Sequence, residues 1–262
     1  IDRGIPPPIP PTTHRFAQQS LIFNLQREWL IGRYAVRYWS DPTMTYTVMT
    51  IDSADQPRVQ GDSFAGGTVS DLTGTDITGE GNPDVVFEMS FGGATGLACP
   101  THIYDLGVRI TKVVETSTSA CGARFADPNV DGIPELIVAD PTYTYQFCSG
   151  AESPLVEVVL AYDRGTRLYR PQSALYPAYY RAQAEAYLAQ TDLAAQIDAL
   201  VQAGAMDSVK CRGLGLGLPY LYGGMTNEAW AQFNRYYRFA DAAAFRSQIE
   251  QLFNSSPFCK RA

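Results

Sequence analysis

DITGEGNPD (residues 76–84) and DPNVDGIPE (residues 127–135) are the two stretches that decide how this chain folds. Both place oxygen-bearing groups at alternate positions, carry glycine at position 6 and proline at position 8, and run into an apolar segment, Val85–Phe87 or Leu136–Val138. Turns favour Gly, Pro, Asn and Asp but do not need so many oxygens. The duplication therefore predicts two equivalent loops, here called loop 1 and loop 2, each followed by a strand.

The oxygens of both loops fit a hard divalent cation, because calcium takes about six to eight oxygen ligands and glycine allows the sharp turn. A backbone carbonyl can serve at position 7. The candidate ligands are Asp76, Thr78, Glu80, Asn82 and Asp84 in loop 1, and Asp127, Asn129, Asp131, Ile133 and Glu135 in loop 2. Position 12 is apolar in both loops, which excludes an EF-hand. The alternative is a pair of acidic turns without metal.

Both loops, with the strands after them, resemble the calcium-binding repeats of FG-GAP and VCBS-type proteins, which carry DxDxDG-like loops and occur in many exported bacterial proteins. The resemblance covers about residues 70–165. It implies calcium ligation by Asp76, Glu80, Asp84, Asp127, Asn129, Asp131 and Glu135. Thr78 stands where the family has an acid or amide, which should weaken the first site. Two repeats are too few for a closed propeller, so a partial assembly of β-sheets is implied.

The order of the remaining patterns predicts an α+β fold. Segments such as 33–39 and 44–51 alternate with the period of two of a half-buried strand. After about residue 174, helix formers dominate, with a glycine-rich connector expected at 212–224. We expect three parts: a proline-rich arm over residues 1–19, a β-rich calcium-loop region over 20–174, and a helical region over 175–262.

Composition and charge restrict the partners. The net charge of −7 argues against nucleic acid, which needs clustered basic residues. No apolar run is long enough to span a membrane. The chain begins at Ile1, which favours removal of an upstream segment on export, although an artificially shortened chain would explain it too. We therefore expect an extracytoplasmic location, with the arm docked on its own domain or a neighbouring subunit.

Five cysteines are compatible with two disulfides and one free thiol in an exported protein. None of them forms a CxxC pair, which makes a zinc knuckle improbable. We expect Cys211 to pair with Cys259, and a second bond among Cys99, Cys121 and Cys148.

The function expected from these features is that of a non-catalytic, calcium-binding structural or interaction subunit in a homo- or hetero-assembly. One alternative is a secreted hydrolase that acts on glycans through an acidic pair, Glu88 and Asp140. Another is a calcium-dependent carbohydrate-binding or adhesion module, which the tyrosine-rich runs would serve. Those runs are Tyr143–Tyr145, Tyr176–Tyr180, Tyr220–Tyr222 and Tyr236–Tyr237.

Overall fold

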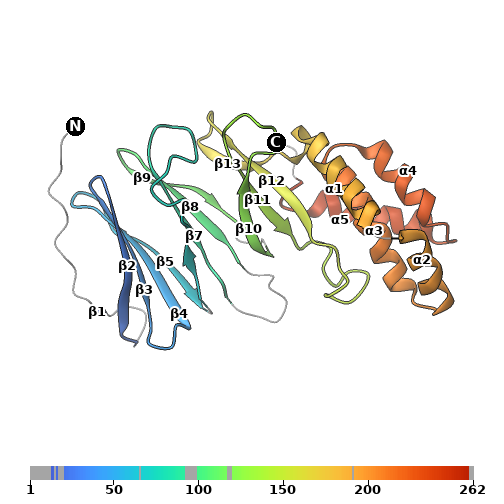
Figure 1. Cartoon of the computed structure of the whole chain (residues 1–262), viewed down its shortest axis with the longest axis horizontal. Helices are drawn as coiled ribbons and strands as arrows, with labels where there is room; N and C mark the ends of the chain where they lie inside the picture. The colour runs from blue at the N-terminus through green and yellow to red at the C-terminus, as the bar shows by residue number, and fades with distance from the viewer. Residues whose placement is uncertain are drawn as a thin grey trace. The chain divides into compact units, whose positions relative to one another are not determined.

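The computed structural model describes residues 13–14, 16, 21–64, 66–91, 99–116, 120–190 and 192–259. These residues form an α+β fold with three antiparallel sheets, five α-helices and no closed barrel (Figure 1). Contacts divide the chain into unit 1, which comprises Ile1–Cys121 and Arg164–Leu168, and unit 2, which comprises Gly122–Asp163 and Tyr169–Ala262. The predicted β-rich region thus contributes to both units.

Unit 1 contains two sheets in which strands adjacent in sequence pair with one another. The first contains β1 (Thr13–His14), β2 (Phe23–Ile31), β3 (Tyr34–Ser40), β4 (Tyr46–Asp52) and β5 (Val59–Phe64). The second contains β6 (Thr68–Val69), β7 (Asp84–Glu88), β8 (Thr101–Leu106) and β9 (Ile110–Glu115). Such meanders need only short connections, and the predicted strands at 33–39 and 44–51 are confirmed as β3 and β4.

Strands β3 and β4 are buried on both faces, so the expected half-buried alternation was wrong there. One face packs Val36 and Ile51 against Val85 and Phe87 of the second sheet. The opposite face places Trp39 in a second apolar cluster and buries Arg37. Arg37 is stabilised there by carboxylates, 2.7 Å from both Glu28 and Asp52.

The third sheet lies mainly in unit 2. It contains β10 (Ala120–Ala126), β11 (Glu135–Asp140), β12 (Val156–Asp163) and β13 (Leu168–Pro171), in sequence order. Strand β11 pairs antiparallel with β12, with Ile137 opposite Val159. The apolar run that follows loop 2 is therefore a buried strand, as predicted.

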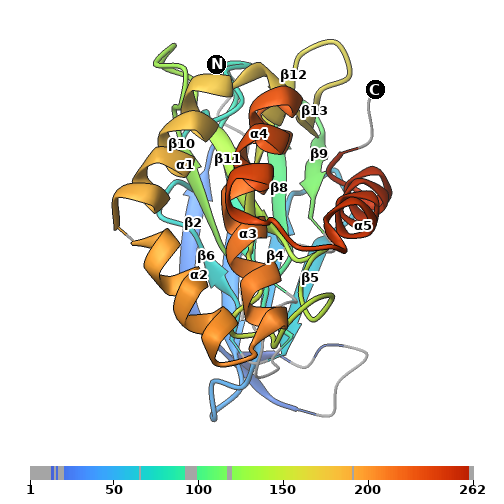
Figure 2. The ribbon, with the colours of Figure 1, turned by 90° about the vertical axis from the view of Figure 1, so that its right-hand side faces the viewer.

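Helices follow the third sheet. They are the 3₁₀ turn η1 (Ser173–Leu175) and the helices α1 (Pro177–Gln190), α2 (Leu193–Gln202), α3 (Met206–Tyr222), α4 (Thr226–Tyr236) and α5 (Ala242–Ser255). Helix α3 contacts α1, α2 and α4 (Figure 2). No described helix is both long and apolar enough to cross a bilayer.

The expected glycine-rich connector at 212–224 was wrong, because most of it belongs to α3. Glycines in this helix let other elements approach closely. A Cβ on Gly215 would lie 3.3 Å from the Tyr187 ring of α1, and one on Gly217 would lie 3.8 Å from the Ala229 carbonyl oxygen of α4. Packing against the neighbouring helices offsets the low helix propensity of glycine.

The cysteine pairing differs from the expected one. Cys148 is bonded to Cys211, across a sequence separation of 63, and Cys259 is a free thiol. The bond therefore joins the loop between β11 and β12 to α3, instead of joining two C-terminal segments. Cys99 is also disulfide-bonded. Of the arm, Thr13 and His14 pair with β2 of the same chain, and residues 1–12 lie outside the described part.

Candidate functional site

Loops 1 and 2 occupy equivalent places in two different sheets. Loop 1 lies between β6 and β7 in unit 1, and loop 2 lies between β10 and β11 in unit 2. In both cases the acid at position 9 is also the first residue of the next strand: Asp84 opens β7 and Glu135 opens β11. The duplicated sequence is thus a duplicated structural unit of loop and strand.

The acid at position 1 caps the backbone in the same way in both loops. In loop 1, the carboxylate of Asp76 accepts hydrogen bonds from the backbone N–H of Glu80 at 3.2 Å and of Gly81 at 2.8 Å. In loop 2, Asp127 accepts them from Asp131 at 3.0 Å and from Gly132 at 2.8 Å. Side chains that bond the local backbone in this way define the turn.

The two loops also share their left-handed residues. Position 6 is glycine with φ of +86° at Gly81 and +87° at Gly132. Position 4 is Gly79 with φ of +69° in loop 1 and Val130 with φ of +60° in loop 2. A β-branched residue in this region is strained, and such strain clusters at ligand-binding sites and tight switches. Loop 2 keeps the loop 1 backbone although valine disfavours it.

Asp84 is fully buried, and one of its oxygens has no partner. Its Oδ2 accepts the backbone N–H of Ile77 at 2.8 Å and of Thr78 at 3.1 Å, and the Thr78 hydroxyl at 3.2 Å. Its Oδ1 is buried and makes no hydrogen bond. Burial, together with the nearby charge of Asp105, raises the pKa of Asp84 to about 7. A buried oxygen without a partner is costly unless a cation compensates it.

Glu135 repeats this arrangement in loop 2. It is 4% exposed; its Oε1 accepts the Tyr176 hydroxyl at 3.0 Å, and its Oε2 is buried without a hydrogen bond. Burial raises the pKa of Glu135, and the charges of Asp131 and Asp127 also raise the pKa. Position 9 therefore carries an unsatisfied buried carboxylate oxygen in both copies.

The remaining predicted ligands are distributed less evenly. Thr78 lies between two acids, because its Oγ1 is 3.4 Å from Asp76 Oδ1 as well as 3.2 Å from Asp84 Oδ2. The Glu80 carboxylate lies 4.0 Å from Arg167, and the Asn82 amide donates to Asp105 at 3.1 Å.

In loop 2, Asp131 at position 5 accepts two hydrogen bonds. Asn129 donates its amide to Asp131 at 2.8 Å, and Asp131 also accepts the backbone N–H of Ile133 at 2.8 Å. In the part of the chain that the structure describes, no three His, Cys, Asp or Glu side chains converge on one point as a metal site. Each loop thus holds several oxygen atoms close to a carboxylate of which one oxygen makes no hydrogen bond, and these groups do not form a closed cage.

Sequence reasoning missed two residues beside the loops. Asp105 is 1% exposed in β8 and faces Asn82 and Arg167. Its signal was an acid inside the apolar stretch HIYDL. Tyr176 lies in a tyrosine-rich run whose surface role was left open, and nothing local linked it to Glu135.

The acidic pair of the hydrolase alternative belongs to two different units. Asp140 is fully buried and serves the packing of unit 2: it accepts the hydroxyls of Tyr222 at 2.6 Å and Ser256 at 2.5 Å, and the backbone N–H of Thr142 at 2.8 Å. Glu88 ends β7 in unit 1, and burial raises its pKa. Asp140 has the surroundings of a structural carboxylate, not those of a solvent-accessible acid.

No family model, curated protein or solved structure matches the chain.

Proposed function

We propose that this chain is a calcium-stabilised β-repeat protein of the FG-GAP or VCBS type, which works as a non-catalytic structural or interaction subunit. The observation that carries the proposal is the pair of equivalent buried oxygens without a hydrogen bond, Asp84 Oδ1 and Glu135 Oε2. Calcium would supply positive charge to these oxygens.

Each loop would bind its ion through the groups already gathered around position 9. In loop 1 these are Asp76, Thr78 and Asp84. In loop 2 they are Asp127 and Asp131 together with Glu135, whose pKa responds to both aspartates. The caps made by Asp76 and Asp127 hold each loop in its turn before the ion arrives, which reduces the ordering cost of binding.

An extracytoplasmic location fits the same proposal. The Cys148–Cys211 disulfide, together with the disulfide-bonded Cys99, supports an oxidising compartment. Extracellular calcium modules work at dissociation constants of about 10⁻⁴ to 10⁻³ M, so loops with few ligating groups are sufficient there. The proline-rich arm would contact a neighbouring subunit; sedimentation mass before and after deletion of residues 1–12 tests that contact, and an unchanged mass argues against it.

Metal analysis and thermal unfolding test the calcium proposal. Calcium at a hundredfold excess over Kd stabilises a protein by about 2.7 kcal/mol per site. This corresponds to a rise in Tm of roughly 5–10 °C over the EGTA-treated protein. Asp127→Asn should reduce that rise because it weakens loop 2. Asp71→Asn is the matched control, since Asp71 is an exposed acid outside the loops. Natively purified protein without calcium, and a Tm that EGTA does not change, would overturn the proposal.

A further inference from the structure

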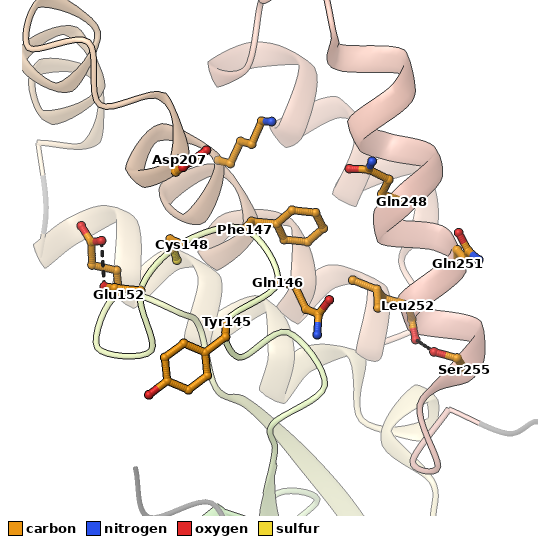
Figure 3. Close-up of a pocket in the computed structure, with 12 residues that line it drawn as sticks. Tyr145, Gln146, Phe147, Cys148, Glu152, Asp207, Gln248, Gln251, Leu252 and Ser255 are labelled. Carbon is orange, nitrogen blue, oxygen red and sulfur yellow. Dashed lines mark hydrogen bonds between the residues drawn. The ribbon is translucent and has the colours of Figure 1, made fainter. Parts of the chain in front are cut away.

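Unit 2 has an open hollow of about 890 Å³ that neither loop explains. One wall is the loop between β11 and β12, with Tyr145, Gln146 and Phe147; the other is α5, with Gln248 and Gln251 (Figure 3). The Cys148–Cys211 bond ties the first wall to α3, so an aromatic segment is fixed at the edge of the hollow.

Tyr145 is an exposed aromatic residue in a strained conformation. Its φ is +61°, and it is 59% exposed, whereas Tyr143, two residues earlier, is fully buried. Non-glycine residues with positive φ cost about 1–2 kcal/mol. Because the residue is more than half exposed, packing of its ring offsets only part of that cost, and strain of this kind is found at binding sites.

The ring of Tyr145 is also held in place. It lies against Gly150, where an added Cβ would come within 2.4 Å of the ring. The backbone N–H of Tyr145 donates to the Ser153 hydroxyl at 3.0 Å, and this hydroxyl in turn donates to the Ser149 carbonyl at 2.9 Å. Such preorganisation lowers the entropy cost of binding a ligand to the ring face.

The polar groups of the hollow favour an uncharged ligand rich in hydroxyls. Among the described residues, the side-chain amides of Gln146, Gln248 and Gln251 form no hydrogen bond, and each can both donate and accept. Two of the three charged side chains that line the hollow are engaged within the protein: Lys210 lies 3.3 Å from Asp241, and Glu152 accepts two serine hydroxyls, while Asp207 is the third. The Tyr145 ring and the amides of α5 lie on opposite sides of the hollow (Figure 3), so they match the apolar face of one sugar and the hydroxyls of another within an oligosaccharide.

We propose that this hollow binds a neutral oligosaccharide, with Tyr145 stacking on the face of one sugar and the glutamine amides bonding hydroxyls of another. The proposal does not rest on calcium. The two proposals can therefore be tested separately. If no oligosaccharide binds in calcium-containing buffer, the calcium proposal is unaffected, and if the protein binds no calcium, the saccharide proposal is unaffected.

Calorimetric titration with neutral oligosaccharides of glucose, mannose, xylose and galactose tests the proposal. At least one should bind, and Tyr145→Ala and the double change Gln248→Ala/Gln251→Ala should each weaken binding about tenfold. Tyr236→Ala, a tyrosine of unit 2 outside this hollow, is the matched control and should bind as wild type. No binding by any oligosaccharide, or unchanged binding by Tyr145→Ala, would overturn the proposal.

Tyr145→Gly separates recognition from structure, because glycine adopts the positive φ without strain. If the ring serves the ligand, this variant should lose binding while its Tm stays equal to or above that of the wild type. A lower Tm together with unchanged binding would show that the ring serves the fold and would overturn the proposal.

Discussion

Loop 1 and loop 2 hold the same backbone conformation but carry its cost at different positions. At position 4, loop 1 uses glycine, for which the left-handed region is free, and loop 2 uses Val130, which is strained and 86% exposed. At position 9, both loops bury an acid that accepts one side-chain hydroxyl and lies near other carboxylates, but burial raises the pKa of Asp84 as far as about 7.

Both loops therefore carry an electrostatic cost at position 9, which is larger at Asp84, and loop 2 carries in addition a conformational cost at Val130. Bound calcium would lower the first cost directly, because a cation compensates the buried charge of Asp84. Bound calcium would offset the conformational cost at Val130 only by holding the strained turn in place. Two copies with equivalent caps can thus differ in how strongly their metal-free forms depend on pH.

The pH dependence of stability is the largest expected difference. The pKa of Asp84 is about 7 in the folded chain, against about 4 when unfolded, so the folded state holds this proton to higher pH. The stabilisation is then fully present below about pH 4 and is lost as pH rises through 7. Three pKa units correspond to roughly 4 kcal/mol. Between pH 5 and pH 8 about two of these three units are lost, so urea unfolding in EGTA should show a loss of roughly 2.7 kcal/mol, and calcium should remove most of it.

Asp84→Asn should flatten the metal-free pH profile, since the amide does not titrate and its oxygen still accepts the Ile77 and Thr78 N–H groups. Glu88→Gln is the control, because the pKa of Glu88 is also raised by burial but this residue lies outside both loops. The effect of Glu88→Gln on the free energy of unfolding should be the same with and without calcium. If the wild type and Asp84→Asn lose equal stability between pH 5 and pH 8, the electrostatic assignment of loop 1 fails.

Calcium affinity gives the next largest difference. Asp131 lies among the acids of loop 2, whereas the Glu80 carboxylate of loop 1 lies 4.0 Å from Arg167, whose positive charge opposes a metal ion. Asp131→Asn should therefore weaken calcium binding about tenfold, and Glu80→Gln only about threefold. Terbium luminescence titration of each variant measures these changes. Equal losses of calcium affinity in the two variants would mean that Asp131 and Glu80 contribute equally to calcium binding, which would contradict this prediction.

Sequence reasoning could predict the loops because their signal is local. Alternate oxygens, a glycine at position 6 and an apolar run specify a turn and the strand after it within about a dozen residues, and the structure has both. The order of strands before helices was predictable for the same reason, since each element has its own periodicity.

The remaining features depend on contacts between distant segments. Helix α3 contains three glycines at alternate positions, and only its packing against α1 and α4 explains why it remains helical. The Cys148–Cys211 pairing depends on where α3 lies, which spacing along the chain does not reveal. Likewise, Tyr176 reaches Glu135 over 41 positions, so no local pattern could join them.

Exchange of the position 4 residues gives the smallest expected effect and the sharpest contrast between the loops. Val130→Gly should stabilise the metal-free protein by about 0.5–1 kcal/mol, because relief of the left-handed strain exceeds the entropy cost of glycine. Gly79→Val should destabilise it by about 1–2 kcal/mol, since it introduces the strain that loop 2 carries. Urea unfolding at fixed pH in EGTA measures both changes.

Val108→Gly is the control for this exchange. Val108 is equally exposed at 86% but is not among the non-glycine residues with positive φ, so this change should not stabilise the protein. If Val130→Gly is destabilising, the side chain of Val130 contributes more than its backbone costs, and the conformational assignment of loop 2 is wrong.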